Sequence, residues 1–139
     1  MAQSYTPITF TGATLTIDRD SHVNTVVNLD RAAGMTVNLP EATGSGDVYR
    51  FYVKTTFTGS CTIAALSTDI MQGGVAIATD VTGVTCPTTA TSDKLVMNGS
   101  TTGGLIGSYV EFRDAVDATW IVTGFLSSSS TEATPFSAT

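Results

Sequence analysis

The chain has little charge and few residues of the kinds that build catalytic or metal sites. Only 13% of its 139 residues are charged, against about 25% in an average domain. Its net charge is −6, and its six basic residues are scattered along the sequence. Because nucleic acids and anionic membranes are bound by clustered Lys and Arg, we expect neither as a partner. No apolar run approaches the roughly 20 residues of a transmembrane helix.

Cysteine is also scarce. Cys61 and Cys86 are the two cysteines of the chain, too few for a disulfide-dense scaffold. The N-terminal segment, residues 1–6, has neither the basic region nor the apolar block of a signal peptide. We therefore expect synthesis in the cytosol, with both cysteines present as reduced, largely buried thiols.

Hydroxyl residues supply most of the polarity. The chain contains 26 Thr and 13 Ser, and 42% of its residues are hydrophobic. Thr is β-branched and favours extended backbone, whereas a helical bundle needs Glu, Lys, Gln and Ala on its surface. Apolar and polar residues alternate with period two in residues 13–17, 35–39 and 49–53, and no segment shows sustained helical spacing. These patterns predict an all-β fold.

Turn residues divide the chain into about nine or ten short strands, which predicts an antiparallel β-sandwich or barrel. Asn98-Gly99 marks a tight turn, and residues 114–117 are predicted to form a hairpin between the last two strands. Residues 71–90 are expected to form a long, partly irregular excursion. The alternation predicts a set of buried core residues, which are Val27, Leu29, Val37, Phe51, Val53, Phe112 and Trp120.

The composition changes near the C-terminus, which divides the chain into a β-domain, residues 1–126, and a Ser-rich tail or arm, residues 127–139. The serine run buries little apolar surface and is typical of a flexible linker. Pro135 and Phe136 follow it as an apolar anchor at the end of the tether. One interpretation is a frayed terminus, and the other is an arm that docks on a neighbour. On the second, Tyr5, Pro135 and Phe136 are candidate contacts with a capsid or another subunit.

The residues indicate no catalytic, cofactor or metal site. His22, the one histidine, is expected on the polar side of a strand, and no Ser lies in a nucleophile-elbow context. Two acidic groups could supply oxygen ligands to calcium, but turn and surface roles explain them better. These groups are Asp18 with Asp20, and Glu111 with Asp114 and Asp117. We therefore expect no enzymatic activity and no cofactor.

The aromatic residues raise the question of carbohydrate binding, because sugar sites use exposed aromatic platforms. Most aromatics alternate with polar residues inside candidate strands, so core packing is the default interpretation. Tyr52 and Trp120 are kept as possible exposed exceptions.

Several segments carry a family resemblance. They are Leu39–Gly46 followed by Tyr49–Phe51, then Met97–Gly104, Trp120–Leu126 and the ending Pro135-Phe136. Together they extend over about residues 23–136. They resemble blocks in small structural proteins of tailed bacteriophages, a group that we associate with capsid decoration, or cement, proteins.

The resemblance implies a virion protein made in the host cytoplasm and bound to the outer capsid surface. A decoration protein binds the major capsid protein of the expanded head, commonly as a homotrimer, and stabilises the head against the pressure of packaged DNA. It needs rigidity and many weak contacts rather than an active site. The alternative is a trimeric tail-fibre or tail-tip module that binds a host surface glycan, and an undetected hydrolase is a weaker rival.

Overall fold

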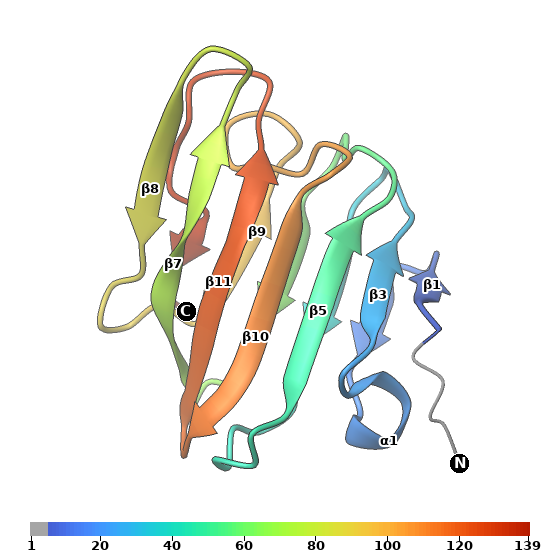
Figure 1. Cartoon of the computed structure of the whole chain (residues 1–139), viewed down its shortest axis with the longest axis vertical. Coiled ribbons are helices and arrows are strands. Elements are labelled where there is room, and N and C mark those ends of the chain that lie inside the picture. Colours follow the sequence, from blue (N-terminus) through green and yellow to red (C-terminus); the bar gives the residue numbers. More distant parts are fainter. Residues whose placement is uncertain (1–5) are drawn as a thin grey trace.

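The computed structural model describes residues 6–139, which form twelve strands in two sheets packed as a β-sandwich, with one short helix (Figure 1). The seven-stranded sheet has the order β1-β3-β5-β10-β11-β7-β8, and the five-stranded sheet has the order β12-β9-β6-β4-β2. The elements are β1 Ile8–Phe10, β2 Thr14–Thr16, α1 Arg19–His22, β3 Val26–Leu29, β4 Met35–Asn38, β5 Val48–Val53, β6 Cys61–Ala64, β7 Ile70–Ala78, β8 Gly83–Pro87, β9 Lys94–Met97, β10 Tyr109–Val116, β11 Thr119–Ser127 and β12 Phe136–Ser137.

The N-terminal half is a coil with two strands per turn. After each strand the chain crosses to the other sheet, so β1, β3 and β5 lie parallel in one sheet, while β2, β4 and β6 lie parallel in the other. The connections of successive turns bond to each other: the N–H groups of Thr58 and Gly59 donate to the carbonyl of Ala32. Gly34 has a φ of +94°, and a Cβ there would lie 2.3 Å from the Ser60 carbonyl oxygen. This turn therefore requires glycine.

The C-terminal half adds mostly antiparallel strands to this coil. β10 and β11 form a hairpin that pairs with β5, and β7 joins the far side of β11 in parallel and carries β8 at the edge. In the second sheet, β9 pairs antiparallel with β6, and β12 pairs with β9. The predicted hairpin between the last two strands and the turn at Asn98-Gly99 are confirmed, but residues 114–116 belong to β10 and the hairpin turns at residues 117–118.

The core lies between the sheets and follows the predicted alternation. All seven predicted core residues are at most 1% exposed. Two edge-to-face ring pairs, Tyr49 with Trp120 and Phe51 with Phe112, have centroids 5.8 and 5.9 Å apart. Both cysteines are buried and free, as expected. No helix among residues 6–139 is long and apolar enough to cross a membrane.

Several parts of the fold prediction need correction. The all-β sandwich is confirmed, but the sheets are mixed rather than antiparallel, and there are twelve strands rather than nine or ten. Residues 71–90 contain the regular hairpin of β7 and β8 rather than an irregular excursion. His22 lies in α1 and is only 8% exposed, because the turn capped by Asp18 folds its ring inward.

The C-terminal segment packs on its own domain instead of extending as a free arm. β12 pairs with the edge of β9, and Phe136 is 8% exposed within the core. The preceding linker is bonded as well, because Glu132 accepts a 2.7 Å hydrogen bond from the Thr82 hydroxyl. The serine hydroxyls that suggested a flexible tether are bonded too, because Ser128 accepts from the Gly103 N–H at 3.1 Å and the Ser130 and Ser100 hydroxyls share a 2.9 Å bond.

Candidate functional site

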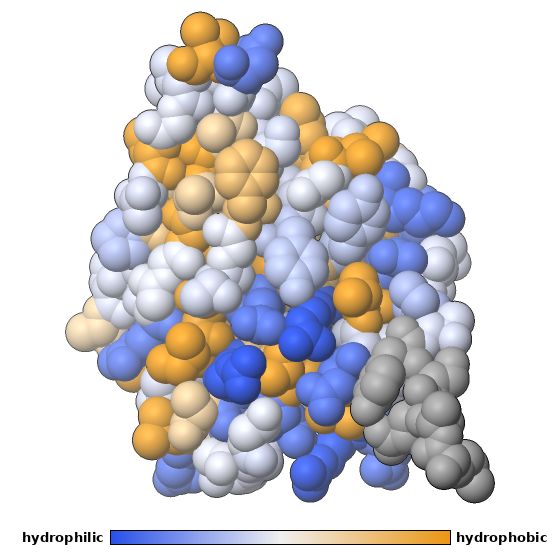
Figure 2. All heavy atoms as spheres, in the orientation of Figure 1, coloured by the Kyte–Doolittle hydropathy of each residue, from blue (hydrophilic) through white to orange (hydrophobic). Residues whose placement is uncertain are grey.

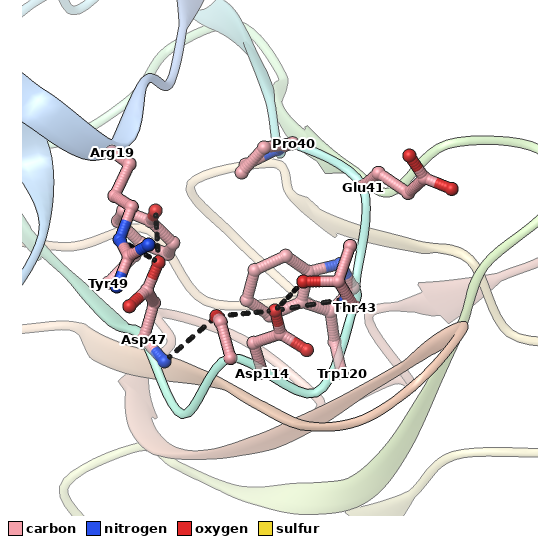
Figure 3. A pocket seen from close by; sticks show the side chains of 9 residues that line it. Arg19, Pro40, Glu41, Thr43, Asp47, Tyr49, Asp114 and Trp120 are labelled. Atoms are coloured by element: carbon pink, nitrogen blue, oxygen red, sulfur yellow. Dashed lines mark hydrogen bonds and ion pairs between the residues drawn. The ribbon is translucent and has the colours of Figure 1, made fainter.

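The best-formed polar recess of the described chain lies at the end of the sandwich where the β10–β11 hairpin turns (Figure 3). It is a cavity of about 150 Å³, and we call it the Asp114 pocket. Its walls come from the connections around α1 and β5 and from the hairpin strands. The lining residues are Arg19, Pro40, Glu41, Thr43, Ser45, Asp47, Tyr49, Asp114 and Trp120.

Asp114 ties the β4–β5 connection to β10. Its carboxylate accepts hydrogen bonds from the backbone N–H groups of Thr43 and Gly44, at 3.0 and 2.8 Å, and from the Ser45 hydroxyl at 2.8 Å. The side chain is only 2% exposed. Burial alone would raise its pKa, but the bonds from these three residues together outweigh it and leave the pKa below the ordinary value of 3.8. Asp114 is therefore an ionised structural anchor and a poor general base.

A second set of polar groups forms the rim. Arg19 Nε lies 3.0 Å from the Asp47 carboxylate, and the Tyr49 hydroxyl donates to the same carboxylate at 3.5 Å. Burial, and then the charge of Asp47, raise the pKa of Tyr49 to about 12, so this hydroxyl stays protonated near neutral pH. With Glu41, the lining carries three carboxylates and one guanidinium. The excess of negative charge disfavours anionic ligands.

Trp120 forms part of the pocket wall, and its indole N–H has no hydrogen-bond acceptor in the described part of the chain. The side chain is fully buried, and its Nε1–H has no hydrogen-bond partner among residues 6–139. The sequence analysis kept Trp120 as a possible exposed platform for sugars, and that expectation is wrong. Since its ring packs against Tyr49, it serves the core.

The Asp114 pocket lacks the parts of a hydrolytic site. Its lining contains no His, Lys or Cys, and the one serine, Ser45, already donates to Asp114. Nucleophilic catalysis requires a base that can take the proton of the hydroxyl, and a carboxyl with a lowered pKa does this poorly. The polar groups of this pocket hold the β4–β5 connection on the hairpin.

A second cavity, of about 380 Å³, lies between the β6–β7 connection and the C-terminus, where Asp69 and Asp93 contribute to its lining. Asp69 accepts a 2.8 Å hydrogen bond from the Ala42 N–H, and Asp93 accepts one of 2.5 Å from the Thr139 hydroxyl. The other oxygen of Asp93 is buried and unpartnered. Within residues 6–139, no three His, Cys, Asp or Glu side chains gather as metal ligands would.

The acidic residues that were weighed as calcium ligands have separate roles. Asp18 caps α1 by accepting from the Ser21 N–H at 2.9 Å. Glu111 pairs with Arg50 at 3.1 Å on the outer face of the seven-stranded sheet, whereas Asp114 of the same strand points inward. The pleat of β10 thus separates the two side chains that the sequence grouped.

The predicted contact residues are also accounted for. Tyr5 lies outside the described residues. Pro135 and Phe136 are buried against the chain's own five-stranded sheet. Their contact with a capsid or a second subunit stays a prediction, and it requires β12 to leave β9.

Sequence reasoning missed an aromatic row on the outer face of the seven-stranded sheet. Tyr52, Tyr109 and Phe125 are direct register partners on the neighbouring strands β5, β10 and β11. The signal for Tyr52 was present, because alternation places it opposite the buried Phe51. Nothing in the local pattern indicated that the three strands would be adjacent.

Comparison with known proteins gives no relative. No protein-family model matches the chain, and no curated protein or solved structure matches it significantly.

Proposed function

We propose that this protein is a capsid decoration, or cement, protein of a tailed bacteriophage. It binds the major capsid protein on the outer surface of the expanded head and reinforces the shell against packaged DNA. The proposal includes assembly as a homotrimer on the capsid. It rests first on the resemblance of the segments around Leu39–Gly46 and Trp120–Leu126 to small phage structural proteins.

The observation that supports it most is how those segments are used in the fold. Residues 43–45 of the first segment bond to Asp114, and Trp120 of the last segment packs against Tyr49, which follows the first. In a third segment, the Asn98 side chain accepts from the N–H groups of Ser100, Thr101 and Thr102. The polar groups of the resembling segments therefore fix loops on a rigid scaffold, which suits a protein that holds others in place.

The test offers purified protein to expanded capsids that lack decoration and, as the control, to unexpanded procapsids. We expect outer-surface density in electron micrographs, hundreds of copies per particle, and greater heat resistance of the shell. Failure to bind expanded capsids would overturn the proposal. A few copies confined to the tail would instead favour the tail-fibre or tail-tip alternative.

A disulfide-locked variant tests whether the C-terminal strand takes part in capsid binding. Lys94 and Ser137 are register partners in the β9–β12 pair, at the separation of Cα atoms that a disulfide spans. The double change Lys94→Cys with Ser137→Cys locks β12 in place after oxidation. If capsid binding needs Phe136, the oxidised variant fails to bind and its reduced form binds normally. Equal binding in both states would exclude the arm as the attachment.

A further inference from the structure

The outer face of the seven-stranded sheet carries a line of aromatic rings across adjacent strands. Tyr52 on β5 pairs in register with Tyr109 on β10, which pairs in register with Phe125 on β11. Adjacent strands are about 4.8 Å apart, so the backbone positions of the three residues follow one another at about that interval. The residues at the two ends of this row are Asn28 on β3 and Ala76 on β7.

These rings project outward rather than into the core. Their chain neighbours Phe51, Val110 and Leu126 are at most 1% exposed, whereas Phe125 is 48% exposed. Successive side chains of a strand point to opposite faces, which places the aromatic row on the free face. Figure 2 shows this face, with apolar colour gathered over the upper parts of β7, β8 and β11. The row thus crosses three central strands near the end of the sheet where β5 and β11 finish and β10 begins, and it extends toward an exposed apolar area.

The surroundings of the aromatic row are polar and locally neutral. Two residues further along the strands, on the same face, Arg50 and Glu111 neutralise each other in a 3.1 Å ion pair, and Thr123 is the register partner of Glu111 on β11. Burial raises the pKa of Tyr109 and the nearby Arg50 opposes it, so this phenol stays an uncharged donor near neutral pH. A partner with a strong charge of either sign gains little from such a surface.

We propose that the aromatic row is a binding platform for an extended, uncharged glycan chain. Sugar rings present apolar C–H faces that stack on aromatic rings, and their hydroxyls bond to phenol, amide and hydroxyl groups at the margins. Three aromatic residues in register on adjacent strands offer successive stacking positions to a chain of sugar units. Because the rings stand on paired strands, binding orders little backbone, which lowers its entropic cost. This inference is independent of capsid attachment.

The shape of the surface favours a chain over a small molecule. Neither of the two cavities described above includes Tyr52, Tyr109 or Phe125 in its lining. A small ligand needs a concave pocket to bury most of its surface, and the outer face of a sheet does not supply one. A ligand that lies across several strands makes several weak contacts at once, and together these give an affinity that no single contact supplies.

The experiment uses the full-length protein labelled with ¹⁵N and titrates it with three neutral probes, cellohexaose, maltohexaose and chitohexaose. We expect saturable amide shift changes on β5, β10 and β11 with at least one probe. Phe125→Ala and Tyr52→Ala should each weaken that binding at least tenfold. The control Val116→Ala removes another exposed apolar side chain, on the hairpin away from the row, and should leave binding unchanged.

Two results would overturn the platform. One is the absence of saturable shifts with all three probes at millimolar concentration. The other is binding that Val116→Ala weakens as much as Phe125→Ala does. Sedimentation of the same variants tests the alternative that a second copy of the chain binds this face. If the protein self-associates, Phe125→Ala abolishes the association and no sugar binds, then the row is a contact between copies. Capsid binding is measured separately, so its failure leaves these results interpretable.

Discussion

The Oδ1 atom of Asp114 accepts a 2.8 Å hydrogen bond from the backbone N–H of Gly44, which lies 70 residues earlier in the chain. This bond joins the two halves of the fold, because Gly44 follows the parallel coil strand β4 and Asp114 lies in the C-terminal hairpin. A carboxylate can accept several such bonds at once, and Asp114 uses both of its oxygens. The Asp114 pocket is the recess that this connection leaves.

Asp114→Ala should lower the free energy of unfolding by about 3 kcal/mol. The change removes the charged acceptor of the Thr43 and Gly44 N–H groups, and a hydrogen bond to a charged group contributes about 1.5–3 kcal/mol. Both residues are exposed, so water replaces part of the lost bonding. Urea titration followed by circular dichroism measures the loss. Asp117→Asn, an exposed change on the same hairpin, is the matched control and should stay within about 0.5 kcal/mol of wild type. If the two changes lowered the free energy of unfolding equally, Asp114 would not be a structural anchor.

Acid should weaken the Asp114 contribution in a defined direction. The pKa of this carboxyl is lower in the folded protein than its ordinary value of 3.8, so the ionised form is favoured by folding. Its stabilisation is complete above that ordinary value and is lost as pH falls through the folded pKa. The stability difference between wild type and Asp114→Asn should therefore shrink below about pH 4. A difference that is constant from pH 7 to pH 2.5 would contradict this linkage.

Phe51→Ala should cost about 3–5 kcal/mol, the usual range for truncating a core Phe. Phe51 is 1% exposed and packs edge-to-face on Phe112. Phe125→Ala, on the outer face, provides the comparison and should cost less than about 1 kcal/mol. Chemical denaturation of both variants tests the facing of the seven-stranded sheet, and a reversed order would mean that its two faces are wrongly assigned.

The local alternation of apolar and polar residues was sufficient to predict the strands and which of their side chains face the core. It was not sufficient to predict which strands pair with each other. Alternation identified Val27 and Phe51 as core residues, and both are buried. The same alternation is silent on whether β3 and β5 run parallel, since that depends on connections that cross between sheets. Short loops favour antiparallel neighbours, so a coil of two strands per turn was not expected from turn spacing.

Functional residues were harder to predict for the same reason. Asp114 was correctly predicted beside a hairpin. The groups that donate hydrogen bonds to its carboxylate, at residues 43–45, come from a distant part of the chain. The aromatic row likewise exists only after β5, β10 and β11 become neighbours. His22 was misplaced because a one-turn helix capped by Asp18 leaves little periodic signal in four residues.

The C-terminal segment gives the last prediction, that Phe136→Ala destabilises the folded monomer. Phe136 is 8% exposed, and its strand pairs with β9 at Leu95. Removing a buried Phe side chain from this edge should cost about 2–3 kcal/mol. Hydrogen exchange should also accelerate at the Asp93 and Val96 amides, which donate to the carbonyls of Ser137 and Pro135.

Ser129→Ala is the matched control, because it changes the linker and keeps the backbone bond from residue 129 to the Ser100 carbonyl. Its stability and exchange rates should match those of wild type. Unchanged stability of Phe136→Ala would instead mean that the segment leaves its sheet in solution, as a free arm does. Deleting the chain from Ser127 onward would remove β12 as well as the linker. A capsid-binding test of such a truncated protein therefore begins by showing that its fold is intact.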